Sequence, residues 1–258
     1  MPRVIAAAPR SWLVVALGLA ACVPEGPSTA DAGAAPQKSA AAPRPKPQEG
    51  VDAAGADAAP SGVLITTVFE DNFDRAELGP DWNVLSPKWK ITAGRLCVRG
   101  ARNHGAWLAR RIPVNARVEF DAFAESSEGD LKAELWGDGT TGATGQSYTN
   151  ATSYLTILGG WKNSKHVLAR LDEHGEDRLE LDIEPGSDDE RARPVESGQP
   201  YHFKIERRDG RTVDWSVNGL SYFELADPDP LAGAGHEHVG FNEWDAPACF
   251  DNLKVTPL

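Results

Sequence analysis

The sequence predicts an all-β fold for residues 63–258, an antiparallel two-sheet sandwich of the jelly-roll type. Apolar and polar residues alternate there in many short runs, which is the period of a half-buried strand, and Gly, Pro, Asn or Asp separates the runs. The stretch is about 200 residues long and has no internal linker, a length that suits one domain. Many short antiparallel strands favour two packed sheets over a helical or doubly wound fold.

Four of these runs each carry one apolar face, at residues 117–124, 131–136, 154–158 and 166–172. In the last two runs, Leu155, Ile157, Val167 and Ala169 are the residues expected to face the core. A hairpin follows, because 201–205 and 213–217 are alternating runs and 208–211 carries an Asp-Gly turn signal. We also expect three tryptophans in the core: Trp89, Trp107 and Trp215.

The N-terminus has the form of a secretory signal. Arg3 and Arg10 precede an apolar run over residues 12–21, and Cys22 follows this run directly. This run is half of the roughly twenty residues that a helix needs to cross a bilayer. We therefore expect residues 1–21 to be a cleaved signal peptide and not a retained membrane span.

Leu19-Ala20-Ala21-Cys22 resembles the lipobox of bacterial lipoproteins. The resemblance implies that Cys22 is lipidated and becomes the first residue, and that the protein is lipid-anchored in the cell envelope. By the same resemblance, Val23 rather than Asp after the cysteine implies the outer membrane of a Gram-negative bacterium. The alternative is an ordinary signal peptide with a chance cysteine.

Residues 22–62 are predicted to form a disordered tether behind this anchor. They are almost all Ala, Pro, Gly, Asp, Ser and Lys, with too few large apolar residues to bury a core. The tether would hold the domain off the membrane. A Pro-rich recognition segment is the alternative.

The formal net charge is −12 and the pI is near 5.0, and no basic stripe interleaves with aromatic residues. Nucleic acid and anionic membrane surfaces are therefore disfavoured as partners, and membrane contact is expected through the lipid alone. With Cys22 assigned to the lipid, Cys97 and Cys249 form an even pair in a compartment that permits disulfides. We predict a bond between them; two buried thiols are the alternative.

The order of several motifs resembles that of concanavalin A-like lectin and glucanase (laminin G-like) jelly rolls. The opening motifs are Phe-Glu-Asp-Asn-Phe-Asp (69–74), Leu-Gly-Pro-Asp-Trp (78–82) and Trp-Lys-Ile-Thr-Ala-Gly-Arg-Leu (89–96), and the closing motifs are 239–241 and 249–255. Residues 154–164 resemble a segment of secreted bacterial sandwiches of uncharacterised role. These sandwiches include lectins, glycosidases, lyases and structural modules, so the fold does not choose among functions.

The resemblance also implies a structural calcium ion. In lichenase-like jelly rolls a calcium ion bound by an aspartate and by backbone carbonyls joins the first strands to the last. Asp251 matches that aspartate by position. The carbonyls would come from near Asp71 and Gly94, and oxygen ligands of this kind suit calcium. The alternative is that Asp251 hydrogen-bonds a turn. The short run His236-Glu237-His238 is interpreted as a polar loop and not as a zinc site.

The glucanase carboxylate motif of this superfamily is absent, so no catalytic residue is assigned. Glu119 and Glu125 lie on one face of a strand, but six residues at about 3.3 Å each separate them by about 20 Å. A retaining dyad needs about 5–5.5 Å. A polysaccharide-active glycoside hydrolase or lyase with an atypical site, such as Glu134 with Asp172 from separate strands, stays as an alternative.

The aromatic residues favour binding of a carbohydrate or another surface polymer without cleavage. The chain has 8 tryptophans, and sugars pack their C–H faces on indole rings while polar groups bind their hydroxyls. The predicted ligand groove lies on the face opposite the apolar positions, with a loop beside it, and consists of Glu134, Trp136, Tyr154, Thr156, Trp161, Asn163, His166, Arg170 and Asp172. A structural or protein-interaction module of the envelope is the third candidate function.

Overall fold

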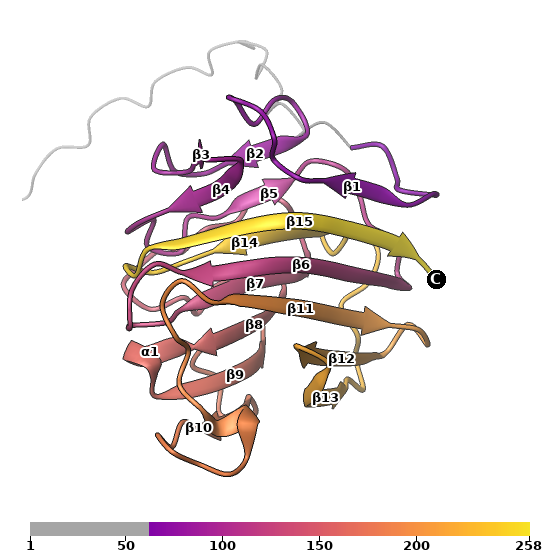
Figure 1. The fold of residues 1–258 in the computed structure, drawn as a ribbon. Coiled ribbons are helices and arrows are strands. Elements are labelled where there is room, and N and C mark those ends of the chain that lie inside the picture. The colour runs from indigo at the N-terminus through magenta and orange to yellow at the C-terminus, as the bar shows by residue number, and fades with distance from the viewer. Residues whose placement is uncertain (1–61) are drawn as a thin grey trace, which may run out of the picture. The chain divides into compact units, whose positions relative to one another are not determined.

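The computed structural model describes residues 62–258, which form two packed antiparallel sheets (Figure 1), so the predicted all-β jelly-roll sandwich is confirmed. The predicted signal peptide, Cys22 and the tether up to residue 61 lie outside the described residues. None of the helices among residues 62–258 is long and apolar enough to span a membrane.

The first sheet has eight strands. They are β1 (Phe69–Asp71), β3 (Lys90–Thr92), β4 (Arg95–Val98), β6 (Ala116–Ala124), β11 (Pro200–Arg207), β12 (Thr212–Val217), β13 (Leu220–Ala226) and β15 (Ala248–Pro257). Their order is β13-β12-β11-β6-β15-β4-β3, and β1 also pairs with β15. The last strand of the chain therefore lies in the middle of this sheet (Figure 1).

The second sheet has seven strands. They are β2 (Trp82–Val84), β5 (Ala106–Leu108), β7 (Leu131–Gly137), β8 (Tyr154–Gly159), β9 (Lys165–Arg170), β10 (Leu179–Asp182) and β14 (His238–Asn242). Their order is β10-β9-β8-β7-β14-β5-β2. The described helical segments are the single turn α1 (Gly160–Asn163) and the 3₁₀ turn η1 (Glu190–Ala192).

Aromatic side chains from both sheets form the centre of the core. Phe241 of β14 stacks on Phe250 of β15 with ring centroids 4.3 Å apart, and Phe120 of β6 meets Phe241 edge-on at 5.0 Å. Phe120 also stacks on Phe203 of β11 at 4.8 Å. The expected hairpin is confirmed as β11 and β12, and Trp89, Trp107 and Trp215 are buried as expected.

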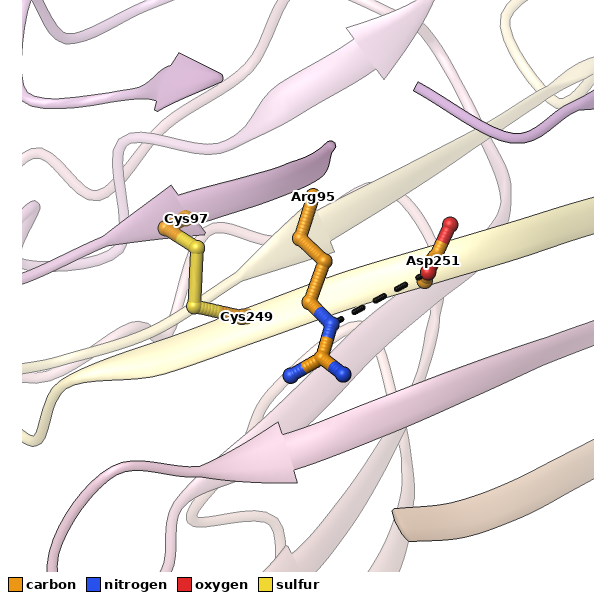
Figure 2. Close-up of a disulfide and its surroundings, with 4 residues drawn as sticks. All are labelled: Arg95, Cys97, Cys249 and Asp251. Atoms are coloured by element: carbon orange, nitrogen blue, oxygen red, sulfur yellow. Dashed lines mark ion pairs between the residues drawn. A yellow bond between two sulfur atoms is a disulfide. The ribbon is translucent and has the colours of Figure 1, made fainter. Parts of the chain in front are cut away.

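The predicted disulfide is confirmed. Cys97 of β4 and Cys249 of β15 are directly opposite each other in the antiparallel pair, and their sulfur atoms are 2.06 Å apart. Figure 2 shows this bond beside Arg95 and Asp251. The bond joins residues that are 152 positions apart in the sequence.

Candidate functional site

A cavity of about 580 Å³ lies on the face of the seven-stranded sheet that is turned away from the other sheet. Lys132 of β7 and Ile157 of β8 pair across the strands and form its floor. Loops that are distant in sequence form its walls, and the full lining is Glu128, Asp130, Lys132, Gln146, Ser147, Ile157, Trp161, Lys162, Glu173, His174, Trp244, Asp245 and Ala246.

A buried ion pair lies in the floor of the cavity. Lys132 is 2% exposed, and its Nζ donates to Asn103 Oδ1 at 2.7 Å and to Glu173 Oε2 at 2.8 Å. Burial opposes the charge on the ammonium group, but Asp130 and Glu173 hold the pKa of Lys132 above its ordinary value. Burial likewise opposes the charge on Glu173, and Lys132 holds that pKa below its ordinary value. Both groups are therefore charged at neutral pH.

Trp161 reaches the cavity from an unusual turn. Trp161 (φ 50°, ψ 52°), Lys162 (φ 59°, ψ 47°) and Asn163 (φ 60°) have consecutive left-handed helical backbone angles, and Gly159 before them has φ 72°. This conformation costs an L-residue roughly 1–2 kcal/mol. Backbone strain of this kind persists where surrounding contacts over-determine it, and it clusters at binding sites.

The side chain of Asn163 holds this turn in place. Its Nδ2 donates to the carbonyls of Ser127 at 3.1 Å and Val195 at 2.8 Å, while its Oδ1 accepts from the Val195 amide at 2.9 Å. Asn163 does not line the cavity. It therefore positions Trp161 and does not itself face a ligand.

Trp244 faces the same cavity from the loop between β14 and β15. Its amide donates to Asp130 Oδ2 at 2.8 Å, and its carbonyl accepts from the Arg102 amide at 2.9 Å. Both tryptophans are partly exposed, and each has a guanidinium group near its ring, Arg102 at 5.2 Å from Trp244 and Arg178 at 4.9 Å from Trp161. Sequence reasoning missed Trp244. Its signal was a tryptophan in the polar stretch between the two closing strands.

The structure splits the predicted groove between two faces of the sheet. Ala133 pairs with Thr156 and Leu135 with Tyr154, so the even-numbered residues of β8 face the core. Tyr154, Thr156 and His166 are buried there, and Arg170 pairs with Tyr154 across the strands. The expectation that these residues share the outer face with Glu134 was wrong.

The physical reason is that this sheet is covered on both faces. The residues expected to face the core, Leu155, Ile157, Val167 and Ala169, instead pack on the outer face under Tyr148 of the segment between β7 and β8, with Trp161 beside them. An apolar run therefore does not identify the core side here.

Trp136 departs from the prediction for a second reason. Its φ is 53°, and the pairing of β7 with β14 shifts register between His238 and Val239. The irregularity breaks the alternation of β7, and Trp136 joins Leu135 in the core, fully buried. Its Nε1 donates to the Pro113 carbonyl at 3.1 Å. Of the predicted ligand-binding residues, Trp161 alone lines the cavity. Asp172 instead caps a turn, where its Oδ1 accepts a hydrogen bond from the His174 amide.

Glu134 is on the outer face but is sealed from solvent. It accepts hydrogen bonds from Tyr148 Oη at 3.0 Å, Ser153 Oγ at 2.6 Å and Asn242 Nδ2 at 2.5 Å. Burial raises the pKa of Glu134 to about 7. Its hydrogen-bond partners do not include Asp172, with which it formed the alternative dyad. Glu119 faces Lys204 and Lys254 on neighbouring strands of the other sheet.

The histidine run is a set of separately bonded residues. His236 Nδ1 is 2.8 Å from the Thr152 carbonyl, His238 Nδ1 is 2.9 Å from the Leu108 carbonyl, and Glu237 pairs with Arg111 at 3.1 Å. Residues 62–258 contain no group of three or more His, Cys, Asp or Glu side chains arranged to hold a metal ion.

Asp251 lies on β15, two residues from the disulfide, and its Oδ2 is 3.9 Å from Arg95 Nε (Figure 2). Desolvation raises its pKa, and the charges of Asp121 and Asp74 act in the same direction. Asp71 accepts hydrogen bonds from Arg75 and Trp82, while Gly94 lies beside the Asp74 carboxylate. Calcium at Asp251 stays a prediction. The negative charges of Asp251, Asp121 and Asp74 favour a cation there, and the guanidinium group of Arg95 already balances part of that charge.

No family model matches the sequence, and no curated protein matches it. Among solved structures, the chain is similar to a native glycosidic hydrolase (12% identity, 76% of this chain, 99% of that chain, TM-score 0.50). It is also similar to a prokaryotic β-1,3-1,4-glucanase (lichenase) derived from a mouse hindgut metagenome (10% identity, 74% and 100% coverage, TM-score 0.50). A carbohydrate binding module, CBM66 from Bacillus subtilis, is 16% identical over 67% of this chain and 94% of that chain, with TM-score 0.47. At these identities the likeness shows the fold alone: the described residues share a jelly-roll fold with the two structures of TM-score 0.50.

Proposed function

We propose that residues 62–258 bind a glycan or another surface polymer in the cavity between Trp161 and Trp244 without cleaving it. The observation that carries the proposal is that two partly exposed tryptophans from separate loops line one cavity with charged and amide groups between them. Indole rings pack on the C–H faces of sugars, while groups such as Gln146 and Asp130 bind hydroxyls.

The state of the buried carboxylates favours binding over cleavage. Glycoside hydrolysis by two carboxyl groups needs one proton donor that faces the glycosidic bond. Glu173 is committed to Lys132 in an ion pair, and Glu134 lies beneath Tyr148 outside the cavity lining. Neither group is placed to donate a proton to a ligand in the cavity.

A hydrolase or lyase is the second candidate, and the pKa of Glu134 favours it. A carboxyl group with a pKa of about 7 has the value expected of a general acid. This reading requires Tyr148 and its segment to move away from Glu134. A structural or protein-interaction module of the envelope is the third candidate.

Polysaccharide depletion and a glycan array test the proposal, with the full chain carrying Cys22→Ser to remove the lipid site. We expect Trp161→Ala and Trp244→Ala each to weaken binding by about tenfold or more, and Trp161→Phe, which keeps an aromatic ring, to weaken it less. Leu220→Ala is the control, because Leu220 is an exposed apolar residue outside the cavity lining.

Each other outcome contradicts the binding proposal. New reducing ends or unsaturated ends in the polymer would move the assignment to a hydrolase or lyase. No binding to any polymer would leave the structural module. Binding that both alanine variants retain would place the ligand elsewhere on the domain.

We also propose that the protein is anchored through lipid on Cys22 to the outer membrane of a Gram-negative cell, with residues 22–62 as the tether. The support is the lipobox resemblance of Leu19-Ala20-Ala21-Cys22 and the composition of the segment after it. We expect Cys22→Ser to abolish labelling by a palmitate analogue in a Gram-negative host, and Val23→Asp to move the protein to the inner-membrane fraction. Labelling of the Cys22→Ser variant would contradict lipidation at this site.

A further inference from the structure

A second hollow of about 580 Å³ adjoins the cavity, and Trp244 and Gln146 line both. Its other lining residues are Arg102, His104, Ala143, Thr144 and Gly145. The two hollows differ in charge, because the second has no carboxylate in its lining while the first has four: Glu128, Asp130, Glu173 and Asp245. A ligand that extends past Trp244 therefore passes from an acidic to a basic environment.

Arg102 is the free cation of the second hollow. It is exposed, its guanidinium carbon is 5.2 Å from the Trp244 ring centre, and among residues 62–258 its side chain makes no ion pair or hydrogen bond. Most arginines of this domain, by contrast, are paired with a carboxylate or a carbonyl. An unpaired guanidinium presents several donors in a fork that matches a carboxylate or sulfate.

The backbone around Arg102 is held in a strained conformation. Arg102 (φ 54°) and Asn103 (φ 58°) are consecutive positive-φ residues; asparagine tolerates this conformation, whereas the arginine side chain disfavours it. Asn103 is buried and accepts from Lys132 in the first cavity, while Arg102 is exposed in the second. Asn103 thus holds Lys132 in the floor of the first cavity while Arg102 lines the second, and Trp161 stands on a similar turn.

His104 adds a second nitrogen to the hollow. Its Nδ1 is 3.1 Å from the Ala101 carbonyl and 3.0 Å from the Arg102 carbonyl, and because carbonyls only accept, Nδ1 carries a hydrogen. Nε2 is therefore left for a ligand, as an acceptor from a hydroxyl when the ring is neutral and as a donor to an anion when it is protonated.

We propose that the second hollow is an anion subsite, in which Arg102 takes a carboxylate or sulfate substituent of the glycan whose neutral part lies between Trp161 and Trp244. His104 Nε2 accepts from a neighbouring hydroxyl of that sugar when the ring is neutral and donates to the anion when the ring is protonated. This inference rests on the proposed function and deepens it. The ligand is a mixed polymer of neutral and anionic units. A uniformly anionic polymer would bring like charges against Glu128 and Asp245 and against a chain of formal net charge −12.

The test compares polymers that share a backbone. Hyaluronan alternates a uronate with a neutral amino sugar derivative, and its carboxyl-reduced form is the matched neutral polymer. A galactan with one sulfate per disaccharide and its desulfated form test the sulfate source, while polygalacturonate represents a uniform polyanion. Binding of the full chain with Cys22→Ser to each polymer is measured by polysaccharide depletion, in parallel with Arg102→Gln, Arg102→Lys and the control Arg99→Gln. Arg99 is exposed and lines neither hollow, so its variant matches the loss of charge.

We expect Arg102→Gln to weaken binding of a mixed anionic polymer by about tenfold and to weaken binding of the matched neutral polymer much less, so that the preference for the anionic form is lost. Arg102→Lys should recover part of the loss, and Arg99→Gln should lose little. The preference for the anionic form should shrink as ionic strength rises from about 0.01 M to about 0.1 M, where the Debye length falls from about 30 Å to about 10 Å. Whichever of the uronate and sulfate pairs shows this behaviour identifies the substituent.

Equal binding of both anionic polymers and their neutral forms, with loss in Trp161→Ala, would overturn the anion subsite and leave the proposed function standing. Tighter binding of polygalacturonate than of the mixed polymers would also overturn it. No binding of any polymer would overturn both proposals.

Discussion

Tyr148 donates a hydrogen bond to Glu134 across 3.0 Å, and neither side chain reaches solvent. The segment between β7 and β8 thus closes over a carboxyl group whose pKa burial raises to about 7. Tyr148 thus covers the outer face of the seven-stranded sheet at Glu134, whereas at Lys132 the same face forms the floor of the cavity.

The raised pKa of Glu134 predicts that the stability of the folded protein falls as the pH rises toward neutrality. The folded protein binds a proton up to a pH of about 7, whereas the unfolded chain releases it near 4.5. The free energy of unfolding should therefore fall by on the order of a few kcal/mol as the pH rises from about 4.5 to about 7. Glu243, whose pKa burial also raises to about 7, acts in the same direction.

Urea unfolding between pH 5 and pH 8 measures this dependence. Glu134→Gln should reduce the slope of the profile to the contribution of Glu243, and Glu224→Gln, at an exposed position of β13, should leave the slope unchanged. A profile that keeps its slope in Glu134→Gln would show that Glu134 titrates at its ordinary pKa in the folded protein.

Removing the Asn163 side chain should loosen Trp161. Asn163→Ala deletes three hydrogen bonds and places alanine at φ 60°, so we expect a loss of about 1–3 kcal/mol in stability and a weaker affinity for the bound polymer. Asn163→Gly, which suits the backbone angle but makes no such bonds, should lose less stability. Thermal unfolding and polymer affinity test this, and unchanged affinity in Asn163→Ala would mean that the turn does not position Trp161.

Loss of the disulfide should lower stability substantially. Cys97 and Cys249 close a loop of 152 residues, for which the chain-entropy model gives about 5 kcal/mol. The double variant Cys97→Ser/Cys249→Ser should unfold at a lower urea concentration than the wild type, and reductant should not change its unfolding midpoint. Reductant should lower the unfolding midpoint of the wild type toward that of the double variant. Coincident unfolding curves of the reduced and oxidised wild type would contradict the prediction.

Calcium should raise the melting temperature if it binds at Asp251. A ligand at 100 times its dissociation constant contributes about 2.7 kcal/mol, which is about 5–10 °C for a domain of this size. The increase should vanish with a chelator and in Asp251→Asn, and should persist in Asp182→Asn, since Asp182 is highly exposed. A melting temperature that does not respond to calcium would leave Arg95 as the counter-charge of Asp251.

Local patterns predicted the elements of the fold that have one buried face. Residues 117–124 and the hairpin of β11 and β12 alternate cleanly, because one side of that sheet faces the core and the other carries polar residues such as Glu119 and Lys204. The pairing of Cys97 with Cys249 followed from cysteine count and compartment. None of these inferences needed to know which segments touch.

The candidate site depended on contacts that a local pattern does not contain. The apolar runs of β8 and β9 have an apolar partner on each face, so their alternation marked the wrong side. Lys132 has the pattern of an exposed strand residue, yet Glu173 from a distant turn and Asn103 from a loop bury its charge. Trp244 reaches the cavity from the far end of the chain. Trp161 was identified because it lies on the loop that follows the run 154–158, beside the predicted groove.

The position of β15 has a consequence for how the chain folds. Of the strands of the eight-stranded sheet, β15 between β6 and β4 is the last to emerge from the ribosome, so this sheet has a gap at its centre until synthesis reaches Pro257. Up to that moment β6 presents an unpaired edge, the kind of surface that recruits other strands. Folding of this sheet must therefore wait for β15 and proceed slowly through long-range contacts. A nonsense mutation just before β15 would yield an aggregating fragment rather than a smaller domain.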